Sequence, residues 1–163
     1  MYLSHLSLVN FKNYTEAQLN FSSGVNCITG TNGSGKTNII DAVYYLSFTK
    51  SYFNISDTQN IQHGESLFVI QGKFSDNEKE EHVFCGVKTG FKKQVKRGGE
   101  EYERLSDHIG LFPVVMVAPV DHILITEGSD ERRKFIDSVI SQVDKAYLEN
   151  LISYNKTLTH RNS

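Results

Sequence analysis

The run of small and polar residues from Gly30 to Thr37, G-T-N-G-S-G-K-T, constrains the fold of this chain more than any other segment. It matches the pattern G-x-x-x-x-G-K-[ST] of a phosphate-binding loop in full. Glycine lets successive backbone N–H groups turn inward around an anion, and the following helix adds the positive end of its dipole. The pattern needs a strand before the loop and a helix after it, and therefore predicts an α/β fold.

Both flanks of the loop have the required hydrophobic pattern. Segment 24–30 is typical of a short buried strand, and Ile39, Ile40, Val43 and Leu46 follow at helical spacing. A chance glycine-rich turn is therefore the less favoured interpretation, and the loop predicts nucleotide binding.

We expect this loop to bind ATP with Mg²⁺. Lys36 would reach the β- and γ-phosphates as a mobile point charge, and the hydroxyl of Thr37 would be a ligand of the metal. The candidate nucleotide-binding residues form one continuous run: Gly30, Thr31, Asn32, Gly33, Ser34, Gly35, Lys36, Thr37 and Asn38.

A second magnesium ligand is harder to find. Asp41 lies on the predicted helix, where a solvent-facing or strand-contacting role is favoured over a catalytic one. Asp121 follows an apolar strand, but Pro119 interrupts that strand and no Glu follows. The sequence therefore predicts nucleotide binding without turnover by this chain alone, and no catalytic residue is assigned.

The rest of the chain alternates between strand-like and helical patterns. Helical periodicity runs from Asp130 to the end, and the polar connection 50–65 is long enough to be functional or mobile. Strands are predicted at 3–11, 17–21, 67–75 and 80–88, in a lysine-rich hairpin turning at Gly98-Gly99, and at 112–119 as a strand buried on both faces.

Composition indicates an ordinary globular domain, with 39% apolar residues and a net charge of -2. No apolar run approaches the roughly 18 residues of a membrane span, so a cytoplasmic protein is expected. Cys27 and Cys85 are expected as buried, reduced thiols and no structural metal is expected. The basic cluster from Lys92 to Arg97 is interpreted as a solvated hairpin, because three glutamates follow within six residues.

A second helix start occurs at Gly128, in G-S-D-E-R-R-K-F-I-D. Ser129 is a favoured N-cap residue, and Asp130 with Glu131 suits the positive end of a helix dipole. Taken alone, the segment needs no ligand.

Together, these segments resemble the N-terminal part of the RecF family of recombination mediators, which are related to the SMC and Rad50 ATPases of the ABC type. The resemblance runs nearly end to end. Besides the phosphate loop, it rests on Leu6 to Tyr14 (L-x-L-x-N-F-K-N-Y), Val114 to Asp121, the segment from Gly128 to Asp137, and Tyr154 to Asn162.

The resemblance implies a P-loop NTPase fold of the ABC-ATPase head type, with a mixed sheet, an antiparallel meander and the start of a helical arm. It divides the chain into a head lobe, 1–127, and a signature motif with the arm, 128–163, of a truncated protein whose Walker B acids come later. The signature residues Gly128, Ser129 and Arg132 would contact ATP held by a partner subunit. Asp130 stands where the family often has proline, and Lys12 where it often has arginine.

In function, the resemblance implies a DNA repair and replication protein, active in the SOS response, that dimerises when it binds ATP. The dimer would clamp DNA at gaps or single-strand/double-strand junctions, recruit a RecR-like mediator and promote recombinase loading. The full-length protein would be a weak DNA-dependent ATPase.

Two rivals predict different sequence features. An SMC- or Rad50-like structural ATPase should continue into long heptads. A small-molecule kinase should carry an arginine-rich lid, and the antiparallel meander argues against it.

Overall fold

The computed structural model describes residues 1–54, 56–76, 79–126 and 128–162. It divides the chain into two compact units, Met1–Leu105 and Ser106–Ser163. The predicted division into a head lobe, 1–127, and a signature motif with the start of the arm, 128–163, stays a prediction.

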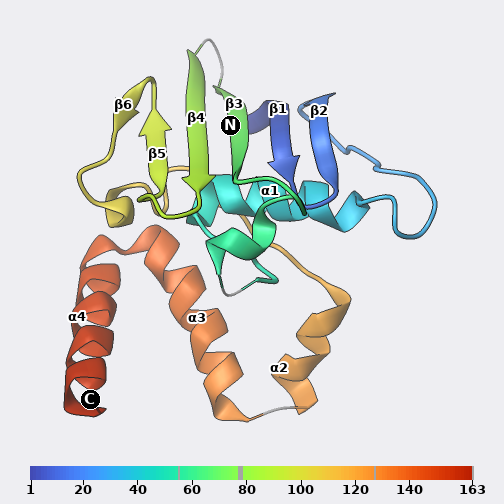
Figure 1. Cartoon of the computed structure of the whole chain (residues 1–163). Helices are drawn as coiled ribbons and strands as arrows, with labels where there is room; N and C mark the ends of the chain where they lie inside the picture. The colour runs from blue at the N-terminus through green and yellow to red at the C-terminus, as the bar shows by residue number, and fades with distance from the viewer. Residues whose placement is uncertain (55, 77–78, 127, 163) are drawn as a thin grey trace. The chain divides into compact units, whose positions relative to one another are not determined.

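The first unit is an antiparallel sheet with a helix across one face (Figure 1). Its strands follow the order β2-β1-β3-β4-β5-β6, so that the first hairpin packs beside the later meander. The predicted strands 3–11, 17–21, 67–75 and 80–88 are confirmed, as is the lysine-rich hairpin. The strands are β1 (Tyr2–Phe11), β2 (Tyr14–Asn20), β3 (Leu67–Asp76), β4 (Lys79–Lys88), β5 (Gln94–Arg97) and β6 (Glu100–Glu101).

Helix α1 (Lys36–Phe48) follows the phosphate loop, as predicted, and closes the core of this unit. Residue Gly72 of β3 lets the helix approach, because a Cβ there would collide with the Leu46 side chain. The predicted apolar stripe is right for Ile39 and Leu46 but wrong for Ile40, which is 45% exposed. Tyr45 is fully buried instead, since its ring packs edge-on against aromatic rings of the sheet.

Two predicted strands are absent from the described residues. Segments 24–30 and 112–119 form no strand, although the sequence pattern predicted one in each. A strand needs ladder hydrogen bonds from a neighbour, and no described segment supplies one to either. Val25 and Val117 are consequently 91% and 84% exposed. The predicted mixed sheet is therefore wholly antiparallel among the described strands.

The polar connection between α1 and β3 is ordered over its described part. The 3₁₀ turn η1 (Asp57–Asn60) carries a fully buried Asn60, whose amide donates to the backbone of Ser56 and Asp57. The predicted turn at Asp76-Asn77 falls partly outside the described residues.

The second unit is helical, as predicted from residue 130 onward. Its apolar stripe on α3 is largely exposed, with Val143 82% accessible. Gly110 packs against the backbone of Gln142, where a Cβ would not fit. None of the described helices is long and apolar enough to cross a membrane. The elements are η3 (Pro119–His122), α2 (Ile123–Thr126), α3 (Ser129–Val143) and α4 (Lys145–Asn162).

The two cysteines differ in exposure, which corrects the expectation that both are buried. Cys27 lies in the unpaired segment and is exposed, whereas Cys85 is buried in β4 and burial raises the pKa of its thiol to about 12. Because the thiolate is the reactive form, only Cys27 should react with a thiol reagent at pH 8 in the native chain. Both should react after denaturation, and rapid native labelling of Cys85 would contradict this arrangement.

Candidate nucleotide-binding site

The phosphate loop ends at the start of α1, where the backbone is prepared for an anion. Gly35 is the N-cap residue, no side chain caps the helix, and its first turn contains no acidic residue. The positive end of the helix dipole is therefore not compensated by the helix's own side chains. This geometry suits a phosphate group, and phosphate binding by this loop stays a prediction.

Lys36 folds back over its own loop. Its ammonium group donates to the carbonyl oxygens of Gly30 at 2.7 Å and Thr31 at 2.8 Å. These contacts hold the positive charge against the loop backbone. An incoming phosphate would compete with the two carbonyls for the ammonium donors, which a flexible lysine stem permits.

The side chain of Asn13, in the turn between β1 and β2, supports the loop from outside the motif. The Asn13 amide donates to the Ser34 carbonyl at 3.2 Å and accepts from the Asn38 amide at 2.8 Å. Gly35 has φ +97, and a Cβ there would lie 2.5 Å from the Asn13 amide nitrogen. Glycine is thus required at this position both by the backbone and by Asn13.

Reasoning from the loop motif alone missed Asn13. The signal that could have found it is the segment N-F-K-N-Y, which supports the family resemblance. The neighbouring Tyr14 hydroxyl also reaches the Ser34 carbonyl, at 3.4 Å. The tight β1–β2 turn therefore positions two side chains against the loop.

Asp41 anchors α1 to this same turn. Its carboxylate is fully buried, pairs with the Lys12 ammonium and accepts from the Ser51 hydroxyl at 2.7 Å and the Tyr52 N–H at 2.7 Å. The solvent-facing role is wrong, because the carboxylate is fully buried among these donors, whereas the strand-contacting role, the other expectation, agrees with the pairing to Lys12, the residue that follows β1. Asp41 is a structural anchor for the helix.

Thr37 is exposed on the first turn of α1, where its hydroxyl would suit a metal bound mainly by phosphate oxygens and water. Its role as a Mg²⁺ ligand stays a prediction. No group of three His, Cys, Asp or Glu side chains that could hold a metal occurs among the described residues. Asp121 accepts from the Ala118 N–H at 2.6 Å and closes a local turn.

In the second unit, the signature segment begins α3, but the cap differs from the prediction. Gly128 is the N-cap residue and Ser129 is the first helical residue. The Ser129 hydroxyl accepts from Arg133 at 2.7 Å, and Arg133 also pairs with Asp130 at 2.7 Å. Arg133 thus neutralises the Asp130 carboxylate. Arg132 donates to the Leu124 carbonyl at 3.3 Å.

The basic cluster from Lys92 to Arg97 is two sets of side chains rather than one patch. Lys93 donates to the Thr49 carbonyl at 2.6 Å and to Asp57 at 2.8 Å. Arg97 makes two hydrogen bonds with Glu81, at 3.0 and 2.9 Å, which lower the pKa of that carboxyl. Lys92 and Lys96 make no ion pair within the described part of the chain.

The antiparallel sheet, the glycine-rich loop and the helix that leaves it define an α/β ATPase head of the ABC type. The family model for the RecF/RecN/SMC N terminal domain matches residues 2–108. The chain belongs to this family, and its sequence corresponds to the N-terminal portion of RecF.

Curated relatives named DNA replication and repair protein RecF match the whole chain. The chain is 50% identical to that of Flavobacterium johnsoniae and 56% identical to that of Phocaeicola vulgatus. It covers 45% and 44% of these two proteins. The chain therefore spans less than half the length of these relatives.

Solved structures agree with the sequence matches. The structure of the recombination mediator protein RecF-ATPrS in the RecFOR pathway superposes with a TM-score of 0.92 at 34% identity, covering 99% of this chain and 44% of that one. A solved SMC ATPase superposes with a TM-score of 0.65 at 22% identity, covering 85% of this chain and 99% of that one, and supports the fold alone.

Proposed function

We propose that this chain forms the ATP-binding N-terminal part of a RecF-like DNA repair protein. In this proposal residues 30–38 bind ATP with Mg²⁺, and ATP binding joins two protomers. Gly128, Ser129 and Arg132 of one protomer would complete the nucleotide site of the other. The ATP-bound dimer would then hold DNA and be recognised by a RecR-like mediator.

The observation that carries the proposal is the braced phosphate loop. Lys36 lies over the loop, the helix start has no acid, and Asn13 holds Ser34 from the side. Two relatives support the choice of nucleotide, since solved RecF structures with ATPrS and with ATP share 34% identity with this chain.

The N-termini of α1 and α3 have different roles in this proposal. The start of α1 has no capping side chain and no acid, so it suits a phosphate on its own chain. The start of α3 presents the Ser129 hydroxyl, and Arg133 neutralises Asp130 beside it. This arrangement suits a weaker contact to a phosphate that the loop of the other protomer already binds. A C2 dimer would then contain two equivalent nucleotides.

The experiment separates binding from dimerisation. Mg-ATP should convert the 18.5 kDa chain into a species of twice that mass by light scattering. Ser129→Arg should abolish the change in mass, because a bulky cation replaces the hydroxyl, while calorimetry still detects ATP binding. Ser153→Arg, on the exposed side of α4, is the matched control and should dimerise normally.

Two results would contradict the proposal. A Ser129→Arg chain that doubles its mass with Mg-ATP would remove α3 from the nucleotide site. A wild-type chain that stays folded and does not bind Mg-ATP would overturn the assignment of the loop.

A further inference from the structure

We infer that residues 60–62, in the polar connection between α1 and β3, position the nucleotide site through the β1–β2 turn and are stabilised in return when ATP binds. These three residues are named the clasp. The inference rests on the proposed function, because it concerns how the ATP site of that function is regulated. It gives a role to a segment that lies outside the phosphate-loop motif.

The clasp pairs with the end of β1, at the turn into β2. Phe11, the last residue of β1, forms an isolated antiparallel bridge with Ile61. Two backbone hydrogen bonds of 2.8 Å flank this bridge, one on each side: the Lys12 N–H donates to the Asn60 carbonyl, and the Gln62 N–H donates to the Asn10 carbonyl. The clasp therefore holds the backbone where β1 enters the turn.

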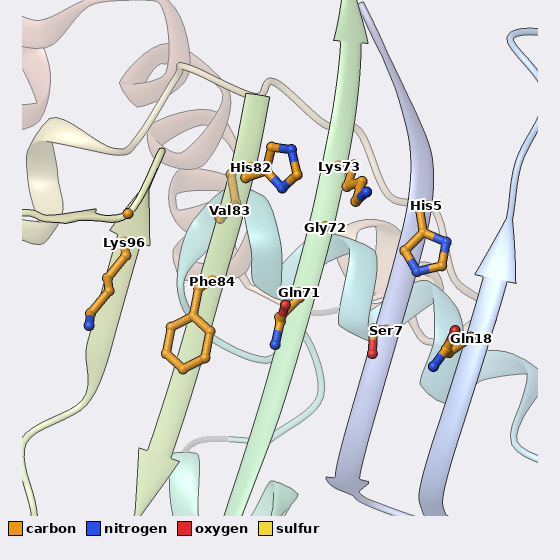
Figure 2. Close-up of a pocket in the computed structure, with 11 residues that line it drawn as sticks. His5, Ser7, Gln18, Gln71, Gly72, Lys73, His82, Val83, Phe84 and Lys96 are labelled. Carbon is orange, nitrogen blue, oxygen red and sulfur yellow. The ribbon is translucent and has the colours of Figure 1, made fainter. Parts of the chain in front are cut away.

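The turn has a backbone conformation that its residues disfavour. Strands β1 and β2 form an antiparallel hairpin, in which Ser7 pairs with Gln18 (Figure 2). Only Lys12 and Asn13 connect the two strands. Asn10 has φ +50 and Lys12 has φ +54, although residues with a Cβ rarely adopt the left-handed region. The turn therefore depends on its contacts, and would relax to another conformation without them.

The clasp holds the turn on both sides of the residues that contact the phosphate loop. Those residues are Asn13 and Tyr14, whose side chains both donate to one carbonyl of the loop. Lys12 precedes them and donates its backbone N–H to the clasp. Thr15 follows them, and its hydroxyl accepts from the Gln62 side-chain amide at 3.0 Å. The positions of Asn13 and Tyr14 thus depend on the clasp.

The clasp is itself anchored to α1. Asn60 is fully buried, and its side chain donates to the carbonyls of Ser56 and Asp57 and accepts from the Asn54 amide at 2.8 Å. The Asp57 carboxylate in turn accepts from the Tyr45 hydroxyl at 2.6 Å. The clasp is therefore connected to the helix that begins at the phosphate loop, by a route separate from the turn.

Two conformations of the turn couple the clasp to the nucleotide. With the clasp bound, the turn holds Asn13 against the loop in the conformation that receives ATP. With the clasp released, the disfavoured φ values relax and only a fraction of the molecules keeps this contact. The apparent Kd for ATP then rises by the inverse of that fraction. Coupling between two sites is reciprocal, so ATP strengthens the clasp by the same factor.

The first test is isothermal calorimetry of the 163-residue chain with Mg-ATP. Gln62→Ala removes the bond to Thr15 and should raise Kd roughly two- to tenfold, the equivalent of one hydrogen bond. Thr15→Val removes the same bond at nearly constant side-chain size and should raise Kd by a similar factor. Thr15→Ser keeps the hydroxyl and should bind as wild type. Gln94→Ala, exposed on β5, is the matched control and should also bind as wild type.

A combined variant separates positioning from general stabilisation. Asn13→Ala/Tyr14→Phe removes both side-chain contacts between the turn and the loop. In that background, adding Gln62→Ala should change Kd by less than about twofold, because the clasp acts through the contacts already lost. Amide hydrogen exchange followed by NMR tests the reciprocal effect. Mg-ATP should slow exchange of the Lys12 and Gln62 N–H groups in the wild type, and should not slow it in Asn13→Ala/Tyr14→Phe.

The results that would contradict the inference differ from those that would contradict the proposed function. A folded wild-type chain that binds no Mg-ATP would overturn the proposed function, and this inference with it. If the wild type binds Mg-ATP, then wild-type affinity in both Gln62→Ala and Thr15→Val would overturn the inference alone. An equal effect of Gln62→Ala in the wild type and in Asn13→Ala/Tyr14→Phe would also overturn it, with circular dichroism confirming the fold of each variant.

Discussion

Replacing Lys36 by alanine is expected to weaken Mg-ATP binding by at least about a hundredfold. Each charge-assisted hydrogen bond to a phosphate contributes roughly 1.5–3 kcal/mol, and 1.4 kcal/mol is a factor of ten. The variant also loses the contacts that Lys36 makes with the carbonyls of Gly30 and Thr31, so the loop would be less ordered before ATP arrives. Isothermal calorimetry with Mg-ATP measures the change directly.

The control for this variant lies at the other end of the same helix. Lys50 is exposed just beyond α1, and Lys50→Ala removes the same charge without touching the loop. It should bind Mg-ATP with wild-type affinity. Equal affinities of Lys36→Ala and Lys50→Ala would mean that the loop is not where the phosphates bind.

Lys36→Arg distinguishes position from charge. The guanidinium keeps the positive charge but replaces a compact ammonium with a planar fork. Because the ammonium of Lys36 lies within 2.8 Å of two loop carbonyls, the larger group should fit poorly. We expect an affinity between those of the wild type and Lys36→Ala.

The sequence predicted the helix after the loop, because its determinants are local, whereas the strand expected before the loop is not formed among the described residues. A glycine, lysine and threonine pattern followed by helical periodicity needs no distant residue to be recognised. Asn13 is different, since it reaches Ser34 across 21 positions of sequence. Only the folded β1–β2 turn brings the two together, and no spacing rule connects them.

The two failed strand predictions have the same physical origin. Segments 24–30 and 112–119 have the composition of buried strands, but pairing depends on a neighbour that composition cannot reveal. In place of a strand, the Asn26 side chain bonds the backbone of Ser22 and Gly24 and closes a small loop. Local hydrogen bonding thus replaces the ladder that the apolar pattern predicted.

Strand periodicity could have improved the interpretation of the basic cluster from Lys92 to Arg97 as a solvated hairpin. Side chains alternate between the two faces of a strand, so Lys96 must face away from Val95 and Arg97. Val95 is buried, and Arg97 pairs with Glu81. Treating the hairpin as a single solvated patch concealed that Lys96 lies on the opposite face of the sheet from Val95 and Arg97.

Asp41→Ala is expected to destabilise the chain by about 3–5 kcal/mol, the usual cost of removing one partner of a buried ion pair. The substitution would leave Lys12, whose side chain is only 12% exposed, without its carboxylate partner. It would also leave the Ser51 hydroxyl and the Tyr52 N–H without an acceptor. Urea unfolding followed by circular dichroism measures the loss as a lower midpoint at an unchanged slope.

An exposed ion pair provides the matched control. Asp130 pairs with Arg133 at 2.7 Å, with side chains 82% and 68% exposed. Exposed pairs contribute little, so Asp130→Ala should change the free energy of unfolding by less than about 1 kcal/mol. Similar decreases in the free energy of unfolding for Asp41→Ala and Asp130→Ala would show that the buried pair of Lys12 and Asp41 contributes no more to stability than an exposed pair.

The double variant Lys12→Met/Asp41→Asn tests what the ion pair does for the site. Removing both charges avoids an unpaired buried cation, so it should recover much of the stability lost in Asp41→Ala. Nucleotide affinity should recover less, because Lys12 is the residue before Asn13 and its pairing with Asp41 fixes the turn that carries the brace to Ser34. Full recovery of both properties would show that the pair stabilises the helix without positioning the loop.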